Sequence, residues 1–286
     1  MAYEIINHAQ ITPMRLYALL RLVSDYPGED GKKICGLLQP NSISENTDAA
    51  NGVLDAAVKC GFVITNSNQQ YFPSKSLPPD LNIKQYLDLM QQNLLGITEE
   101  EKNNFLLNIF AAWYAVLDEK ALTYENKGFM AADFNKQIFP DLESRALNDT
   151  KLRGMEDWLS FLGFGWNLDR GDNFLIPDAT GRIEPLLPKL LPVQEWVPFG
   201  KFMKQIADYC PELDNGELYK RCWSAINGQK VHGNKISLML STGLRTLQST
   251  GEISLDRVAD ASDQWTLFED ISSEFNIITH IYLGKK

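Results

Sequence analysis

Cysteine and histidine side chains are the residues of this sequence that could bind a metal or act as nucleophiles. They are Cys35, Cys60, Cys210, Cys222, His8, His232 and His280. Zinc sites usually contain ligand pairs about two to four residues apart, and no pair here has that spacing. We therefore expect no metal site and buried free thiols in a reducing cytoplasm. A Ser/His/Asp or Cys/His catalytic set meets only in space, so the sequence leaves that alternative open.

The motifs of the common enzyme classes are missing from the sequence. It contains no phosphate loop, no HExxH or GxSxG motif and no zinc-deaminase signature. Gly163-Phe164-Gly165 precedes an expected hairpin rather than a helix, so it is not a dinucleotide fingerprint. Adjacent acidic pairs such as Glu156-Asp157 are typical of solvated helix faces. These observations predict a protein without enzymatic activity and without a cofactor.

The charge of the chain is acidic on average but unevenly distributed. The sequence has 27 basic and 37 acidic residues, a net charge of −10, which excludes a uniformly basic nucleic-acid coat. Residues 97–160 are the most acidic part, with seven basic and twelve acidic side chains. A surface of that charge favours docking to other proteins over binding to DNA.

Residues 218–250 form a basic stretch without any acidic residue. We expect this stretch to supply the second and third helices of a helix-turn-helix, which face the duplex in that motif. The candidate DNA-binding residues are Lys220, Arg221, Lys230, His232, Lys235 and Arg245. Five phosphate contacts would give a slope of roughly −4 to −5 in log affinity against log salt, with little sequence specificity. The alternative is a solvated helix pair whose positive charge offsets acidic neighbours.

The N-terminal residues have the element order of a winged helix-turn-helix. Apolar spacing predicts helices over 11–24, 32–38 and 46–59, the first of them capped by Thr12 and started by Pro13. Phe62–Thr65 and Gln70–Pro73 then read as a β-hairpin.

The remaining chain repeats this order twice. In the middle we expect a long helix over Thr98–Leu117 that opens with a capping box of Thr98 and Glu101. Further helices follow over 131–139 and 150–162, and then a hairpin that turns at 169–172. The last third predicts helices over 199–209, 216–227 and 236–248, a hairpin of 251–255 with 264–268, and a strand within 275–283.

These patterns predict a mostly α fold with small β-hairpins (α+β), built as tandem winged helix-turn-helix-like units. The expected domains are 1–80, 81–192 and 193–286, with connectors at 74–80 and at the proline-rich segment 183–198, which we expect to be non-helical. The alternative is one or two α-rich domains of generic helices.

No stretch approaches the about 18 to 20 apolar residues of a membrane span, and no signal peptide is visible. We therefore expect a cytoplasmic protein without membrane contact.

The segment WLSFLGFGWNL…NFLIPDATGRIEPLLPKLL (158–191) resembles the middle of DpdG-type proteins. Those proteins are encoded with bacterial systems that install 7-deazaguanine bases in DNA and restrict unmodified DNA. The resemblance implies a component of a phage-defence or DNA-restriction complex.

We expect an adaptor that docks other protein subunits of such a complex and contacts double-stranded DNA weakly. The alternative is a winged-helix transcriptional regulator that binds operator DNA, although the sequence shows no dimer element. An enzyme without recognisable motifs is a third possibility.

Overall fold

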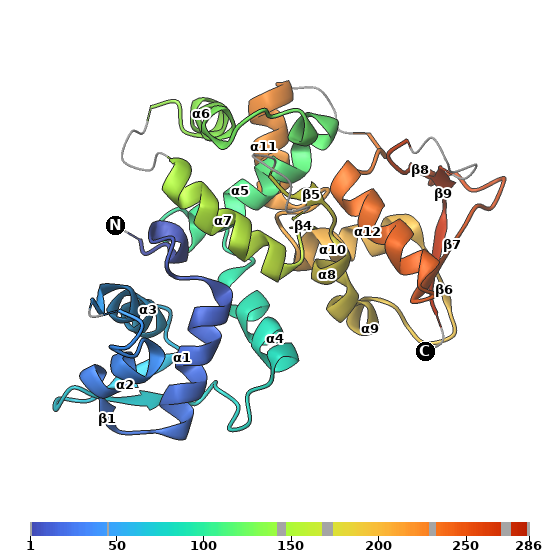
Figure 1. Cartoon of the computed structure of the whole chain (residues 1–286). Helices are drawn as coiled ribbons and strands as arrows, with labels where there is room; N and C mark the ends of the chain where they lie inside the picture. Colours follow the sequence, from blue (N-terminus) through green and yellow to red (C-terminus); the bar gives the residue numbers. More distant parts are fainter. Residues whose placement is uncertain are drawn as a thin grey trace.

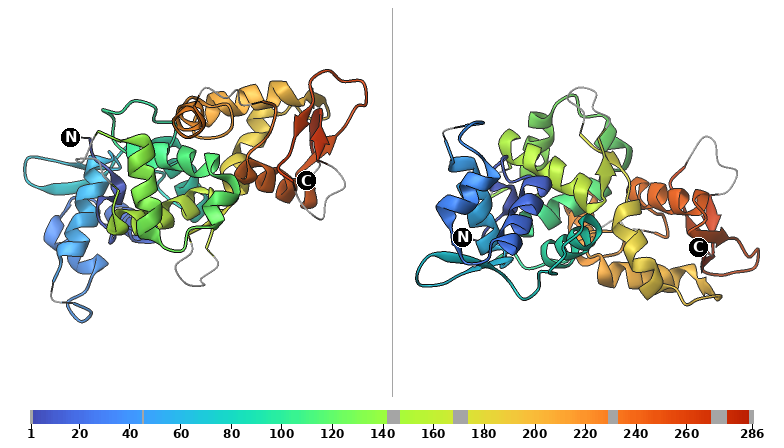
Figure 2. Two further views of the ribbon diagram at one scale, coloured as in Figure 1. Left: turned by 90° about the horizontal axis from the view of Figure 1, so that it is seen from above. Right: turned by 60° about the horizontal axis from the view of Figure 1, so that its bottom comes forward.

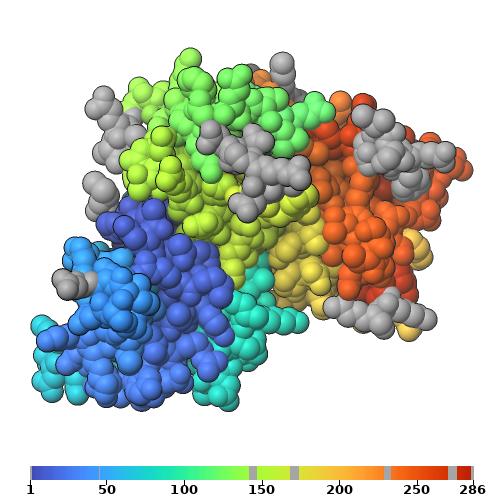
Figure 3. All heavy atoms as spheres, in the orientation of Figure 1, coloured from blue at the N-terminus to red at the C-terminus, as the bar shows by residue number. Residues whose placement is uncertain are grey.

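The computed structural model describes residues 2–44, 46–141, 147–167, 174–228, 233–269 and 276–284. These residues are mostly helical and form four small antiparallel sheets (Figure 1). The molecule is elongated, and both views in Figure 2 place the N-terminal helices and the C-terminal sheet at opposite ends. The space-filling view shows the N-terminal part as a lobe (blue) beside the rest of the molecule (Figure 3).

The N-terminal part contains three helices and a three-stranded sheet. Its elements are α1 (Pro13–Asp25), β1 (Glu29–Asp30), α2 (Gly31–Leu38), α3 (Asp48–Lys59), β2 (Val63–Thr65) and β3 (Gln70–Pro73). The strand order is β1-β3-β2, with both pairs antiparallel. The sequence located these helices and the β2–β3 hairpin, but it did not indicate β1. As expected, Thr12 caps α1 by accepting a hydrogen bond from the backbone N–H of Arg15.

The middle of the chain surrounds one central helix, α5. Its elements are η1 (Ile5–Asn7), which comes from the N-terminus, α4 (Ile83–Leu94), α5 (Phe105–Val116), η2 (Asp118–Leu122), α6 (Lys127–Ile138), α7 (Asp149–Leu162), β4 (Gly165–Trp166) and β5 (Ile176–Pro177). The short strands β4 and β5 form the expected antiparallel pair, and their expected turn at 169–172 lies outside the described residues. All twelve residues of α5 are buried, whereas the sequence predicted a helix with one apolar face.

The helix expected over Thr98–Leu117 begins only at Phe105, and the capping box of Thr98 and Glu101 is wrong. Asn104 adopts a left-handed conformation with φ of 63°, which prevents the helix from extending toward the N-terminus. Its backbone N–H donates to the Tyr3 carbonyl at 2.7 Å, and its side-chain oxygen accepts from Ile5 N–H at 2.9 Å. Contacts with the start of the chain therefore set the start of α5.

The last third of the chain contains helices and a second three-stranded sheet. Its elements are α8 (Thr180–Ile183), η4 (Glu184–Leu186), α9 (Leu187–Leu190), β6 (Trp196–Pro198), α10 (Phe199–Tyr209), α11 (Glu217–Asn227), α12 (Leu238–Ser249), β7 (Ile253–Asp256), β8 (Trp265–Thr266), β9 (Ile277–Ile278) and β10 (His280–Leu283). Helices α10 and α12 pack against this sheet, whereas α11 packs against α5. The proline-rich segment was expected to be non-helical, but it forms short helical turns in which Pro185 and Pro188 occupy the first positions.

The expected hairpin between 251–255 and 264–268 is also wrong. Strand β7 pairs with β10, β8 pairs with β9, and β10 lies between β6 and β7. The tail of the chain supplies both partner strands, so each half of the expected hairpin pairs with the tail rather than with the other half.

Helices α3 and α7 end with the same backbone motif. Gly61 and Gly163 both have positive φ, and the residue after each glycine donates its N–H to a carbonyl five residues earlier, in Ala57 and Leu159 respectively. The surroundings of the two glycines differ. A Cβ on Gly163 would lie 2.4 Å from the carbonyl carbon of Gly181, whereas a Cβ on Gly61 would have no neighbour within 4 Å.

We expect Gly61→Ala and Gly163→Ala to differ strongly in their effect on stability. The first substitution costs only the strain of a positive φ, about 1 to 2 kcal/mol. The second adds a clash between two backbone segments, for a total of about 3 kcal/mol or more. Chemical denaturation of both variants measures the difference, and equal costs would contradict the close approach of Gly163 to Gly181.

Candidate nucleic-acid interface

The basic stretch lies on two helices that pack against different parts of the molecule. Helix α11 packs mainly against α5, whereas α12 packs mainly against α8 and β7 and less extensively against α5, β5 and η2. In Figure 1, α11 lies behind α5 and α12 lies toward the C-terminal sheet. The two helices therefore present their charges in different surroundings.

Two carboxylates, the buried Asp214 and the half-buried Asp118, hold the start of α12. Ser237 caps the helix, and the Asp214 carboxylate accepts hydrogen bonds at 2.7 Å from both the N–H and the hydroxyl of Ser237. Asp118, in η2, accepts from Leu238 N–H at 2.7 Å. Helix N-termini favour negative charge, which explains this arrangement. It links the end of α5, through η2, to α12.

The burial of these carboxylates opposes their ionisation. The pKa of Asp118 is raised from 3.8 to about 7, mainly by burial; the bond from Leu238 N–H opposes this shift, and the nearby charges of Asp214 and Glu119 add to it. Burial also raises the pKa of Asp214 to about 6, against the opposing effect of its bonds to Ser237. The junction between η2 and α12 therefore titrates near neutral pH.

Lys220 and Arg221 are exposed neighbours on α11 with different surroundings. The Arg221 guanidinium forms an ion pair with Glu100 and lies 5.5 Å from the ring centroid of Phe105. Lys220 lines a hollow of about 770 Å³ between α10 and the start of α11. Lys204, on α10, lines the same hollow, together with the carboxylates of Asp208 and Glu217. Lys204 was not among the residues predicted from the sequence, although its position on the polar side of an amphipathic helix was a usable signal.

Arg245 and Lys235 lie near the short β8–β9 sheet. The guanidinium of Arg245 donates to the Phe268 carbonyl at 2.7 Å and to the Asn276 side-chain oxygen at 2.9 Å, so it holds two loop segments together. Lys235 is exposed and forms a β-bridge with Thr266. Lys230 and His232 lie outside the described residues. Arg221 and Arg245 therefore have partners within the protein. The contact with DNA stays a prediction.

The described residues contain no group of three or more His, Cys, Asp or Glu side chains arranged to hold a metal ion. The four cysteines are free thiols, three of them buried. Among the helices of the described ranges, none combines the length and the apolar character needed to span a bilayer.

A family model described as DpdG-like matches residues 3–261 of the chain. No curated protein and no solved structure matches it.

We expect Asp118→Asn to stabilise the protein at pH 8 and to have little effect at pH 5. A carboxyl group with a raised pKa in the folded state contributes stability below its unfolded pKa of 3.8, and this contribution is lost as the pH rises through about 7. Asparagine can accept the bond from Leu238 without a charge, and it tolerates the positive φ of Asp118. The gain at pH 8 should be about 2 kcal/mol.

Thermal unfolding at several pH values tests this expectation, with Asp133→Asn as the control of opposite sign. Burial opposes the ionisation of Asp133, but bonds from Tyr124 and Lys120 outweigh it and lower its pKa. That variant should therefore lose stability at pH 8. A constant difference between Asp118→Asn and the wild type from pH 5 to pH 8 would contradict the buried-carboxylate argument.

Proposed function

The chain belongs to the DpdG-like family, and we propose that it is a non-enzymatic adaptor of a bacterial DNA-restriction or phage-defence complex. Family membership indicates a role in a DNA-modification system and is the observation that carries the proposal. In the proposed role, the chain docks other subunits and contacts double-stranded DNA weakly.

The surface of α3 supports protein docking by the N-terminal part. We propose that this part is a winged helix-turn-helix, because three helices and the β1-β3-β2 sheet follow in the order of that fold. The third helix of such a unit usually reads DNA. Here its exposed side chains include Asp48 and Asp55, and Lys59 is paired with Asp55 at 2.7 Å. Phosphates would be repelled by this helix, so a protein partner is the better occupant.

Lysines of the last third support a weak contact with DNA. Lys204 and Lys220 lie on facing helices beside one hollow, and Lys235 is exposed near the start of α12. Carboxylates in the same hollow reduce the local positive charge. Three lysine contacts would give a salt slope of about −3, smaller than the slope expected from five cations.

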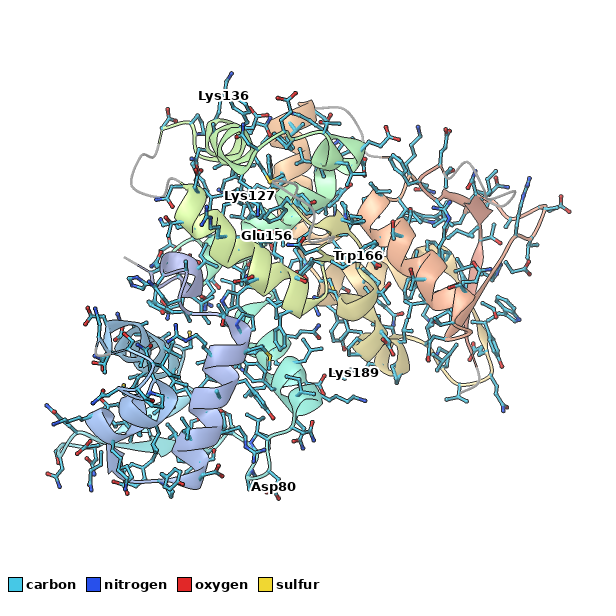
Figure 4. The ribbon with its side chains drawn as sticks, viewed as in Figure 1. Asp80, Lys127, Lys136, Glu156, Trp166 and Lys189 are labelled. Atoms are coloured by element: carbon cyan, nitrogen blue, oxygen red, sulfur yellow. The ribbon has the colours of Figure 1, made fainter. Side chains whose placement is uncertain are left out.

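The double variant Lys204→Glu with Lys220→Glu should lower the affinity for random duplex DNA about tenfold at low salt. Fluorescence anisotropy titrations over a range of salt concentrations measure both the affinity and the slope. The double variant Lys32→Glu with Lys136→Glu, at exposed positions on α2 and α6 away from the proposed contact, is the control with the same change of charge (Lys136 in Figure 4). If the affinity of the double variant Lys204→Glu with Lys220→Glu for DNA is unchanged, the hollow lined by Lys204 and Lys220 does not contact DNA.

The adaptor role itself predicts that the full chain co-purifies with the products of neighbouring genes. The winged-helix element order of the N-terminal part favours a transcriptional regulator as the second candidate, which would bind a promoter fragment far more tightly than random duplex. The regulator is the better assignment if a tagged chain co-purifies with no product of a neighbouring gene and binds its own promoter more tightly than random duplex.

A further inference from the structure

Helices α3, α7 and α12 occupy equivalent places in the three parts of the chain. Each ends at a glycine with positive φ: Gly61, Gly163 and Gly251. The residue after each glycine donates its N–H to a carbonyl five residues earlier. The following residue begins a strand, β2, β4 or β7, which pairs antiparallel with β3, β5 or β10 respectively. Positions on the three helices can therefore be matched by counting back from the glycine.

The outward side of α12 is covered by another segment of the same chain. Ser241 is buried, and its hydroxyl accepts a hydrogen bond at 2.8 Å from the N–H of Phe268, which follows β8. Arg245, one turn further along α12, donates to the carbonyl of the same Phe268 at 2.7 Å. Side chains of α12 therefore bind the main chain of the segment that covers the helix.

The outward side of α7 is covered by the start of the chain. The N-terminal turn η1 packs against α7 (Figure 1), and a Cβ on Gly154 would lie 3.3 Å from the Ile6 carbonyl oxygen. The indole N–H of Trp158 donates to the Ile11 carbonyl at 2.8 Å. The cover of α7 is therefore also a polypeptide segment, and its main chain lies close to a glycine of the helix.

The positions of α3 that match those of α12 are open. Asn51 takes the place of Ser241 and is exposed. Asp55 takes the place of Arg245 and is also exposed. The connection between β7 and β10 contains β8 and β9, whereas β2 and β3 are joined by residues 66–69 alone. This shorter turn contains no counterpart of the segment that covers α12.

The position of α3 that matches the glycine of α7 is open as well. Gly52 takes the place of Gly154, and a Cβ on Gly52 would have no neighbour within 4 Å. Glycine destabilises the interior of a helix, and on α7 the close approach of η1 explains its presence. On α3 no described segment of the chain makes that approach. Ala56, which matches Trp158, is buried, so the open area is the outward side of residues 48–55.

The polar groups on this side of α3 suit a polypeptide main chain. The Asn51 amide can accept a hydrogen bond from an N–H and donate one to a carbonyl. The Asp55 carboxylate can accept from a further N–H, although it already pairs with Lys59 at 2.7 Å. A DNA phosphate carries acceptors only, so it can bond neither to Asp55 nor to the side-chain oxygen of Asn51. A polypeptide is therefore the better occupant.

We propose that the outward side of residues 48–55 binds a short segment of a partner protein through the main chain of that segment. The partner then supplies to α3 the kind of cover that other segments of this chain supply to α7 and α12. The inference rests on the proposed adaptor function and assigns a surface and a mode of binding to one partner. In the bound state the main chain of the segment lies over Gly52 and bonds to Asn51.

Substitution of Gly52 by a larger residue tests the proposal in the full chain. The probe is the neighbouring-gene product that co-purifies with the wild-type chain, purified and labelled. Gly52→Gln should weaken its binding about tenfold or more, because the new side chain occupies the space of the bound main chain. In the free chain the substitution should raise the unfolding temperature by about 2 °C, since the site is open and glutamine favours a helix more than glycine does.

Gly36→Gln on α2 is the matched control. Gly36 also lies within a helix, and a Cβ there would have no neighbour within 4 Å. This variant should show a similar rise in unfolding temperature and an unchanged affinity for the partner. The comparison separates the loss of a binding surface from an effect on folding.

Asn51→Cys reports the contact directly. Alkylation of the introduced thiol, followed by mass spectrometry of the peptide that contains it, should slow about tenfold or more when the partner is bound. Lys32→Cys, at another exposed position of the N-terminal part, should keep its rate. Equal rates at position 51 with and without the partner would place the partner elsewhere and overturn the inference.

The outcomes separate this inference from the adaptor proposal. If a neighbouring product co-purifies but binds Gly52→Gln as tightly as Gly36→Gln, the inference is wrong and the adaptor proposal stands. If no neighbouring product co-purifies, both are wrong. If Gly52→Gln weakens the binding of duplex DNA, or abolishes self-association of the chain, while partner binding is unchanged, this side of α3 binds DNA or a second copy and the inference is wrong.

Discussion

Helix α5 is buried along its whole length, and much of the architecture follows from this constraint. A helix that is apolar on every side must be enclosed by other segments. Here the enclosing segments come from all parts of the chain: α11 packs along α5, Phe134 of α6 contacts Phe110, and Asn108 donates to the Leu94 carbonyl at the end of α4. The Glu4 carboxylate accepts a hydrogen bond from Leu106 N–H in the first turn of the helix. One shared core therefore joins the three regions that the sequence suggested as separate units.

Local sequence signals predicted the elements whose ends depend on nearby residues. Thr12 and Pro13 start α1 because Thr12 caps the helix, and Phe199 and Tyr209 bound α10 as expected from apolar spacing. The start of α5 depends instead on Tyr3 and Ile5, about a hundred residues away, so a good capping box at Thr98 was misleading. The pairing of β7 with β10 likewise depends on contacts distant in sequence. Helix α4 was missed, although Asn82 and Gln85 form a genuine capping box before it.

In the candidate sites, too, the features that depend on nearby residues were predicted, and those that depend on distant contacts were not. Composition located the cations of residues 218–250, but composition does not show which of them already have partners. Arg221 lies beside Glu100, and Arg245 bonds to the Phe268 carbonyl, both through contacts between distant parts of the chain. The contact between the rings of Trp196 and Tyr282 on the C-terminal sheet was also missed. These residues are neighbours only because β6 pairs with β10, and the sequence did not indicate that pairing.

The enclosure of α5 by α11 also has a consequence for the order of events on the ribosome. Val116 is synthesised 111 residues before Asn227, the last residue of α11. At roughly 5 to 20 residues per second, the partner helix emerges roughly 6 to 22 seconds after α5. During that interval the apolar surface of α5 that α11 buries in the folded protein is exposed. A chaperone could bind this segment of the nascent chain.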